Sequence, residues 1–249
     1  MRYNKGNQNE EDLIKAIDGK KFEEFGNNLK NMLRIMFEDI DDSVFTAEPC
    51  DPAGKPDIKV TYHGVSKYVS VKSGGAIQIH AEKIRHFILF LRSKGISKAT
   101  QRTILLYQYG DGSMDGTGKD RLTYEEILPK MRDEVNAANL ELNKDKDFIA
   151  EFVYHIIFEG NSTSLPKADY IYFGTHEYGL LCSANQIDKH VRRKCYTYIK
   201  SPHIGPVIFG PRARYVNYNS VSEEQRDWVG FKWCRLEADM SYISNRYDY

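Results

Sequence analysis

The sequence predicts an α/β protein in which helices flank a central mixed β-sheet. Apolar residues recur at helical steps of three and four between positions 9 and 38, apolar and polar residues alternate between 44 and 73, and short strand-like runs dominate from 168 onward. A chain of 249 residues is compatible with a single domain of this class. We therefore expect residues 1–249 to form one domain, with a core at 9–110, a helical insertion at 120–160 and a strand-rich part at 165–249.

The front half alternates between predicted helix and strand. An apolar stripe predicts helix over residues 9–38, in two pieces around Gly19, and residues 44–73 are expected to form three strands. The stripe comprises Phe22, Phe25, Leu29, Met32, Leu33 and Met36. The next predicted elements are a helix at 77–94 with Ile84, Phe87, Ile88 and Leu91 facing inward, a strand at 102–110 and a glycine-rich loop at 110–119.

The back half begins with an inserted pair of helices. Thr123 and Glu126 have the spacing of a capping box, which predicts a helix from there to about 140, and 145–160 is a second predicted helix. The predicted elements that follow are strands at 169–174, 178–184, 205–210, 214–219 and 228–236, with a short helix at 184–194.

Composition excludes several classes of protein. The chain has no run of about 18 apolar residues, which argues against a membrane span. Its first residues, MRYNKGNQNEEDL, lack the apolar stretch of a signal peptide, so we expect a cytoplasmic protein. The cysteines at 50, 182, 195 and 234 show no metal-binding spacing and are expected to be reduced thiols.

A net charge of zero conceals an uneven distribution. Residues 185–214 contain seven Lys or Arg and one acid, interleaved with tyrosines and histidines, a composition that suits phosphate contacts and base stacking. The predicted nucleic-acid contacts are Arg192, Arg193, Lys194, Lys200, Arg212 and Arg214. A solvated run of charges explains the same composition equally well.

The stretch KPDIKVTYHGVSKYVSVKSGG (55–75) predicts a hairpin. Both runs alternate between apolar and polar residues, and a two-residue type II′ turn at Gly64-Val65 pairs His63 with Ser66. That register sets Asp57 opposite Lys72, on the polar face, with side chains about 5 Å apart at Cβ. An ordinary surface salt bridge accounts for this pair as well as a catalytic one does.

The proline–aspartate pair followed by SVK on the next strand resembles the PD-(D/E)xK nuclease superfamily, which includes restriction endonucleases. The segment GKKFEEFGNNLKNML (19–33) is similar to the G-x-x-F-E helix that often precedes these strands, with Glu23 at its acidic position. The likeness covers residues 19–110. It implies a restriction-endonuclease-like core that hydrolyses phosphodiesters, most often of duplex DNA.

The chemistry that this resemblance implies depends on a divalent metal. Hard carboxylate oxygens bind Mg²⁺, with Mn²⁺ as a substitute, and the ion activates water and stabilises negative charge on phosphate. Asp57 would be the metal ligand, the Val71 carbonyl a further ligand, and Lys72 the group that positions or deprotonates water.

One position departs from the family pattern. Ser70 occupies the place where the superfamily has Asp or Glu, and some restriction enzymes with S-x-K take the missing acid from the helix that follows. Glu82 is the first candidate for that acid, with Glu23 and Glu48 as alternates.

Three functions remain open from the sequence. The first is an Mg²⁺-dependent endonuclease acting on DNA, as a homodimer through helices 123–158 because cutting both strands commonly uses twofold symmetry. The second is a catalytically inactive nucleic-acid-binding module on the same fold. The third is a structural or regulatory protein without a nucleic-acid role.

Overall fold

The structure is a computed structural model of a mixed α/β protein, and it describes residues 5–74, 78–118, 121–162, 164–196, 199–211 and 223–247. Its contacts group into two compact units. The first comprises residues 1–77, 154–190 and 235–249, and the second comprises 78–153 and 191–234. The core expected at 9–110 is therefore divided at residue 78, and each unit has a sheet of its own.

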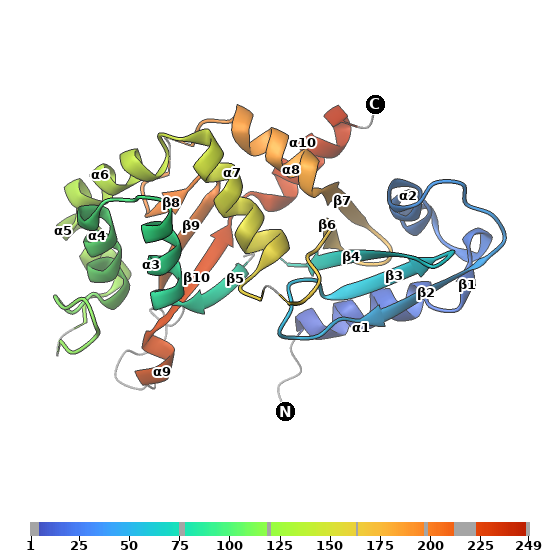
Figure 1. Cartoon of the computed structure of the whole chain (residues 1–249), viewed down its shortest axis with the longest axis horizontal. Coiled ribbons are helices and arrows are strands. Elements are labelled where there is room, and N and C mark those ends of the chain that lie inside the picture. Colours follow the sequence, from blue (N-terminus) through green and yellow to red (C-terminus); the bar gives the residue numbers. More distant parts are fainter. Residues whose placement is uncertain are drawn as a thin grey trace. The chain divides into compact units, whose positions relative to one another are not determined.

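The first unit contains a six-stranded mixed sheet in the order β1-β2-β3-β4-β6-β7. All neighbouring strands are antiparallel except β4 and β6, which are parallel (Figure 1). The three strands predicted between 44 and 73 are confirmed. The strands are β1 (Lys20–Lys21), β2 (Val44–Pro49), β3 (Ile58–Tyr62), β4 (Val65–Lys72), β6 (Tyr170–Gly174) and β7 (Gly179–Ser183).

Helices cover this sheet, and Figure 1 shows α1 running along β2. The predicted break at Gly19 is confirmed, because the helical region divides into α1 and α2 and Gly19 adopts a φ of 73°. Leu13 and Ile17 of α1 are fully buried against the sheet core. The helices are α1 (Lys5–Ile17), η1 (Phe22–Glu24), α2 (Asn27–Met36), a π-helical turn η2 (His155–Glu159), α8 (Ala184–Arg193, which ends in the second unit) and α10 (Leu236–Tyr247).

The second unit contains a four-stranded antiparallel sheet in the order β5-β10-β9-β8. Aromatic rings of Phe87, Phe152, Phe209 and Phe231 pack together in its core. Its strands are β5 (Gln78–Lys83), β8 (His203–Ile204), β9 (Val207–Pro211) and β10 (Trp228–Trp233). Its helices are α3 (Ile84–Ser93), α4 (Lys98–Tyr109), α5 (Tyr124–Lys130), α6 (Arg132–Leu142), α7 (Lys146–Tyr154) and α9 (Glu223–Arg226).

Two predicted elements have the wrong type. The expected helix at 77–94 begins only at Ile84, because residues 78–83 pair with β10 as strand β5. The expected strand at 102–110 is helix α4, since Ser97 caps its N-terminus by accepting a bond from the Thr100 amide and Gly110 ends it with a left-handed φ of 68°. The predicted burial of the α3 positions Ile84, Phe87, Ile88 and Leu91 is confirmed.

The inserted helices agree with the sequence. The capping box between Thr123 and Glu126 is present in both directions, and α7 with η2 covers the helix predicted at 145–160. The helix predicted to run to about 140 is divided into α5 and α6 at Met131. The strand predicted at 214–219 lies outside the described residues, and α10 was not predicted.

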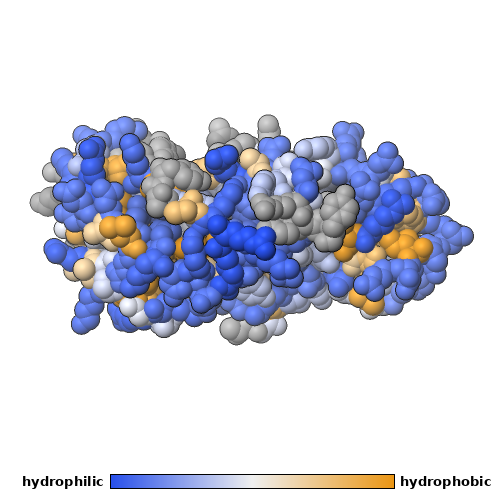
Figure 2. Space-filling model, turned by 90° about the horizontal axis from the view of Figure 1, so that it is seen from above, coloured by the Kyte–Doolittle hydropathy of each residue, from blue (hydrophilic) through white to orange (hydrophobic). Residues whose placement is uncertain are grey.

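Among the described residues, a small number of large hydrophobic side chains are exposed. Figure 2 shows a face on which hydrophilic residues predominate and hydrophobic ones form small separate patches. Single exposed side chains such as Leu89 and Leu140 are normal for a folded domain. None of the helices within the described ranges has the length and apolar character needed to cross a bilayer.

Candidate active site

The hairpin that carries Asp57 and Lys72 turns at a different place from the one predicted. Strands β3 and β4 pair Tyr62 with Val65 and Ile58 with Val69, so the turn residues are His63 and Gly64. Both have positive φ, 47° and 73°, which is the type I′ geometry that follows the right-handed twist of the strands. The predicted Gly64-Val65 turn is wrong, because His63 adopts a positive φ, which is uncommon for a residue other than glycine.

The corrected register keeps the two charged residues on the same face. Continuing the observed pairing sets Asp57 opposite Ser70 and Lys72 two residues further along β4. A slip of one residue would have moved Lys72 to the other face, whereas a slip of two preserves the alternation. The sequence therefore predicted correctly that Asp57 and Lys72 lie on the same face of the sheet. The prediction that they lie directly opposite each other is wrong.

Three donors converge on one oxygen of the Asp57 carboxylate. Lys72 Nζ lies 2.9 Å from Oδ2, the Val71 amide nitrogen lies 2.6 Å from it, and Ser70 Oγ lies 3.2 Å from it. None of these bonds reaches Oδ1. Lys72 Nζ also donates to the Val71 carbonyl at 2.7 Å, and only 15% of the Lys72 side chain and 25% of the Asp57 side chain are exposed. This pair is thus positioned more firmly than an exposed salt bridge.

A second carboxylate belongs to the same neighbourhood. Burial is the main cause that raises the pKa of Glu10 from 4.5 to about 7, the negative charge of Asp57 is the second cause, and the positive charge of Lys72 opposes both. Glu10 lies on α1, one turn before Leu13 and two turns before Ile17, on the helix face that packs against the sheet. Glu10 was not among the residues predicted from the sequence. The signal that could have identified it is an acid at helical spacing from the apolar residues Leu13 and Ile17.

The acids predicted to complete the site have other surroundings. Glu23 is exposed, and its carboxylate lies 2.7 Å from Lys30 Nζ. Glu48 on β2 lies opposite Lys59 on β3, and its carboxylate lies 2.7 Å from Lys59 Nζ. Glu82 lies on strand β5 in the second unit, not on a helix, and its buried carboxylate lies 3.9 Å from His80 Nε2.

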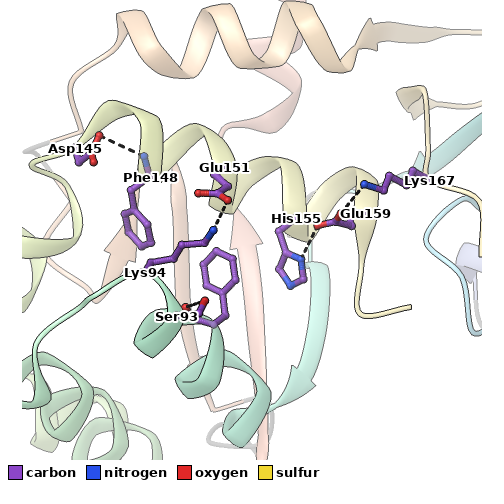
Figure 3. A network of polar contacts seen from close by, with 9 residues as sticks. Ser93, Lys94, Asp145, Phe148, Glu151, His155, Glu159 and Lys167 are labelled. Atoms are coloured by element: carbon purple, nitrogen blue, oxygen red, sulfur yellow. Dashed lines mark hydrogen bonds and ion pairs between the residues drawn. The ribbon is translucent and has the colours of Figure 1, made fainter. Parts of the chain in front are cut away.

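Another group of charged side chains follows α7 and η2 and is drawn in Figure 3. In the second unit Lys94 donates to Glu151. In the first unit Glu159 accepts a bond from Lys167 at 2.6 Å and contacts the His155 ring at 3.3 Å. Half of the Lys167 side chain is exposed. Exposed ion pairs of this kind contribute about 0–1 kcal/mol to stability. We therefore assign the Lys94–Glu151 and Lys167–Glu159 pairs a structural role.

The residues predicted to contact nucleic acid lie in different surroundings. Arg192 forms an ion pair with Asp147, and the Lys194 carbonyl accepts a bond from Lys146. Arg193 is exposed. Lys200 lines a surface pocket in the second unit together with Leu128, Pro129, Arg132 and Asn136. Arg212 and Arg214 lie outside the described residues.

The oxygens around Asp57 fit a hard divalent cation. Mg²⁺ usually takes one or two protein carboxylates and keeps several waters. Asp57 and Glu10 supply two carboxylates, and the Val71 carbonyl is a third oxygen beside the Lys72 ammonium. A cation held by both acids would offset the negative charge of Asp57, which after burial is the second cause of the raised pKa of Glu10. Among the residues with described positions, no cluster of three or more His, Cys, Asp or Glu side chains is arranged to hold a metal.

A thiol lies beside this site. The Cys50 amide donates to the Asp57 carbonyl at 3.1 Å, and burial together with the charges of Asp57 and Glu48 raises the pKa of the Cys50 thiol to about 11. The thiol is therefore neutral at physiological pH and adds no charge to the site. The four cysteines, all at described positions, are thiols and form no disulfide with one another, as the sequence predicted.

No family model matches the sequence, and no curated protein matches it either. The chemistry of this site must therefore be inferred from its own geometry.

Proposed function

We propose that this protein is a Mg²⁺-dependent endonuclease with a restriction-endonuclease-like core, and that it hydrolyses phosphodiester bonds of duplex DNA. The observation that carries the proposal is the convergence of the Lys72 ammonium, the Val71 amide and the Ser70 hydroxyl on one oxygen of Asp57. The acid Glu10 interacts electrostatically with the same pair. An ordinary surface salt bridge would need neither the additional donors nor the second acid.

In this proposal some residues would bind the cation, and others would orient the attacking water and the Asp57 side chain. Asp57 through Oδ1, the Glu10 carboxylate and the Val71 carbonyl would hold the cation. When bound, Mg²⁺ or Mn²⁺ supplies a water of lowered pKa and a positive charge beside the phosphate. Lys72 would orient the attacking water and balance the charge that develops on the phosphate oxygens. Ser70 and the Val71 amide fix the rotamer of Asp57.

The substrate class follows from the electrostatics of the chain as well as from the site. A scissile phosphodiester is anionic, and residues 185–214 bring a formal charge of +6 to a chain of zero net charge. Arg193 and Lys200 are exposed members of that segment. Duplex DNA is the expected substrate through the resemblance to restriction enzymes, and a twofold dimer is the expected form. Light scattering that shows a monomer on a duplex substrate would remove the dimer.

The direct test is cleavage of supercoiled plasmid and linear duplex DNA with 5–10 mM Mg²⁺ or Mn²⁺, on the order of the concentrations that weak carboxylate sites require. Asp57→Asn and Lys72→Ala are expected to reduce the cleavage rate at least about a hundredfold, as loss of a positioned catalytic group does. The matched control is Glu48→Gln, which breaks the cross-strand pair with Lys59 on the neighbouring strands and should leave the rate unchanged. If Glu48→Gln lowers the rate as much as Asp57→Asn, the assignment of the site is wrong.

A non-cleaving nucleic-acid-binding module is the second candidate function. The observation that favours it is Ser70, because a hydroxyl replaces the acid that the superfamily pattern requires. Salt-dependent binding of duplex DNA by the wild type, without cleavage in either metal, would establish this function. Absence of any salt-dependent binding would instead favour a structural or regulatory role.

A further inference from the structure

A hydrogen bond joins the N-terminal part of α1 to the end of strand β6. Asn9 Nδ2 donates to the Gly174 carbonyl at 2.9 Å. Gly174 is the last residue of β6, and Phe173 before it pairs with Lys72 in the parallel register of β4 and β6. Neighbouring strands lie about 4.8 Å apart, and a strand advances about 3.3 Å per residue. Asn9 is therefore bonded to the sheet close to the strand end that carries Lys72.

The carbonyl that accepts this bond belongs to the turn between β6 and β7. Gly174 has a φ of 136°, and a Cβ added there would lie 2.2 Å from the Tyr178 carbonyl oxygen, so this position requires glycine. The Thr175 amide donates to the Tyr178 carbonyl at 2.7 Å. The Asn28 side chain of α2 accepts a bond from the Gly179 amide at 3.0 Å. Because the turn is held by these bonds, the Gly174 carbonyl has a defined position.

Among the described residues of α1, full burial begins only at Leu13. Residues 8–10 are partly buried, and the Gln8 side chain bonds within the helix, to Asp12 at 2.9 Å. The ends of helices open at little cost in free energy unless contacts hold them. The bond of Asn9 thus joins α1 to the sheet four residues before the first fully buried side chain.

The acid of the proposed active site is the next residue along the chain. Glu10 follows Asn9 at a rise of about 1.5 Å along the helix axis. The pKa of Glu10, raised mainly by burial, also responds to the charges of Asp57 and Lys72. The bond from Asn9 to Gly174 leads to the same neighbourhood independently, through the pairing of β6 with β4. Two separate observations therefore place this turn of α1 near Lys72.

We propose that Asn9 is a positioning residue of the proposed active site, whose bond to the Gly174 carbonyl holds α1 so that the Glu10 carboxylate reaches the divalent cation. This role rests on the proposed function, because it requires that Glu10 and Asp57 share a cation. In this role Asn9 contacts neither the cation nor the substrate. A ligand that is held in place before binding does not have to be ordered when the cation binds. Loss of the bond should therefore weaken cation binding.

The experiment measures the binding of Mn²⁺ alone, without DNA, from the electron paramagnetic resonance signal of the free ion. Alanine is a better helix former than asparagine, so Asn9→Ala removes the bond without lowering the helix propensity of α1. The net contribution of a hydrogen bond corresponds to about a two- to tenfold change in an equilibrium constant, and the Kd for Mn²⁺ should rise by that factor in Asn9→Ala. Gln8→Ala is the matched control, because it removes the adjacent bond to Asp12 and should leave the Kd unchanged.

Two further measurements show where each variant acts. Asp57→Asn should abolish the Mn²⁺ binding, which would assign the ion to the proposed site. Amide hydrogen exchange without metal should be about two- to tenfold faster at residues 9–12 of Asn9→Ala, with unchanged rates at residues 15–17. Thermal unfolding checks that each variant is folded. If Asn9→Ala does not fold, Asn9→Gln replaces it, with the same direction expected because its amide is displaced by one methylene.

The proposal is overturned if the wild type and Asn9→Ala bind Mn²⁺ equally well, even when Asn9→Ala has a lower unfolding temperature. Unchanged hydrogen exchange at residues 9–12 of Asn9→Ala overturns it too, as does equal weakening by Gln8→Ala. Each of these results leaves the proposed nuclease activity standing. If the wild type binds no Mn²⁺, or if Asp57→Asn binds it as well as the wild type does, the proposed metal site and the role of Asn9 are both wrong.

Discussion

Replacing Glu10 with glutamine tests the electrostatics of the candidate active site through stability. The pKa of Glu10 rises from 4.5 to about 7 in the folded protein because of burial and the nearby Asp57 charge. Between these two pH values the folded state retains a proton that the unfolded state has lost. Stability contributed by this group is thus fully present below pH 4.5 and is lost as the pH rises through 7.

The structure sets the size of the effect. The difference between a pKa of 4.5 and about 7 is equivalent to about 3.4 kcal/mol if fully realised. Because Glu10 is only half-buried, water screens much of this, and we expect about 1–2 kcal/mol. Glu10→Gln carries no charge at any pH, so it should equal the wild type near pH 4.5 and exceed it by that amount at pH 8.

Urea denaturation of both proteins from pH 5 to pH 8.5, without divalent metal, measures the difference in unfolding free energy. Glu11→Gln is the matched control, since Glu11 is the adjacent exposed acid on α1, pairs with Lys15 at 3.6 Å among the described residues, and is the smallest of the causes that raise the pKa of Glu10. A difference between Glu10→Gln and the wild type that stays constant across this pH range would refute the reasoning. If the proposed site holds Mg²⁺, the ion at pH 8 should stabilise the wild type more than Glu10→Gln, because the Glu10 carboxylate would be one of its ligands.

Three further changes have defined outcomes. Ser70→Ala should weaken the proposed metal-dependent cleavage less than tenfold, because Lys72 and the Val71 amide still hold Asp57. A loss as large as that of Asp57→Asn would show that the Ser70 hydroxyl is itself a ligand. A thiol reagent at pH 8 should label the exposed Cys195 and Cys234 quickly and Cys50 and Cys182 slowly. Mass spectrometry measures the order of labelling, and early labelling of Cys50 would contradict the raised pKa of its thiol. Gly110→Ala should lower the free energy of unfolding by about 1 kcal/mol, because a left-handed φ of 68° ends α4 there; equal stability in thermal unfolding would contradict this.

The sequence by itself determined the features that depend on local pattern. Thr123 and Glu126 form the predicted capping box because both partners lie within one turn of the chain. Strands β3 and β4 were found from alternation, and the parity of that alternation set Asp57 and Lys72 on one face even though the turn was misplaced. A shift of two residues in the strand pairing leaves every side chain on the same face of the sheet. The shared face of Asp57 and Lys72 could therefore be predicted without the exact register.

Only the tertiary structure decided the features that depend on distant partners. Residues 78–83 form a strand because β10, far along the chain, pairs with them, and the helical periodicity after Ile84 concealed this. Glu10 joins the candidate site because the apolar face of α1 packs against the sheet and carries that acid toward Asp57 and Lys72. Local preferences extend over a few residues, whereas strand pairing and helix docking bring together groups that no short window contains, and that is why the second acid emerged only from the folded chain.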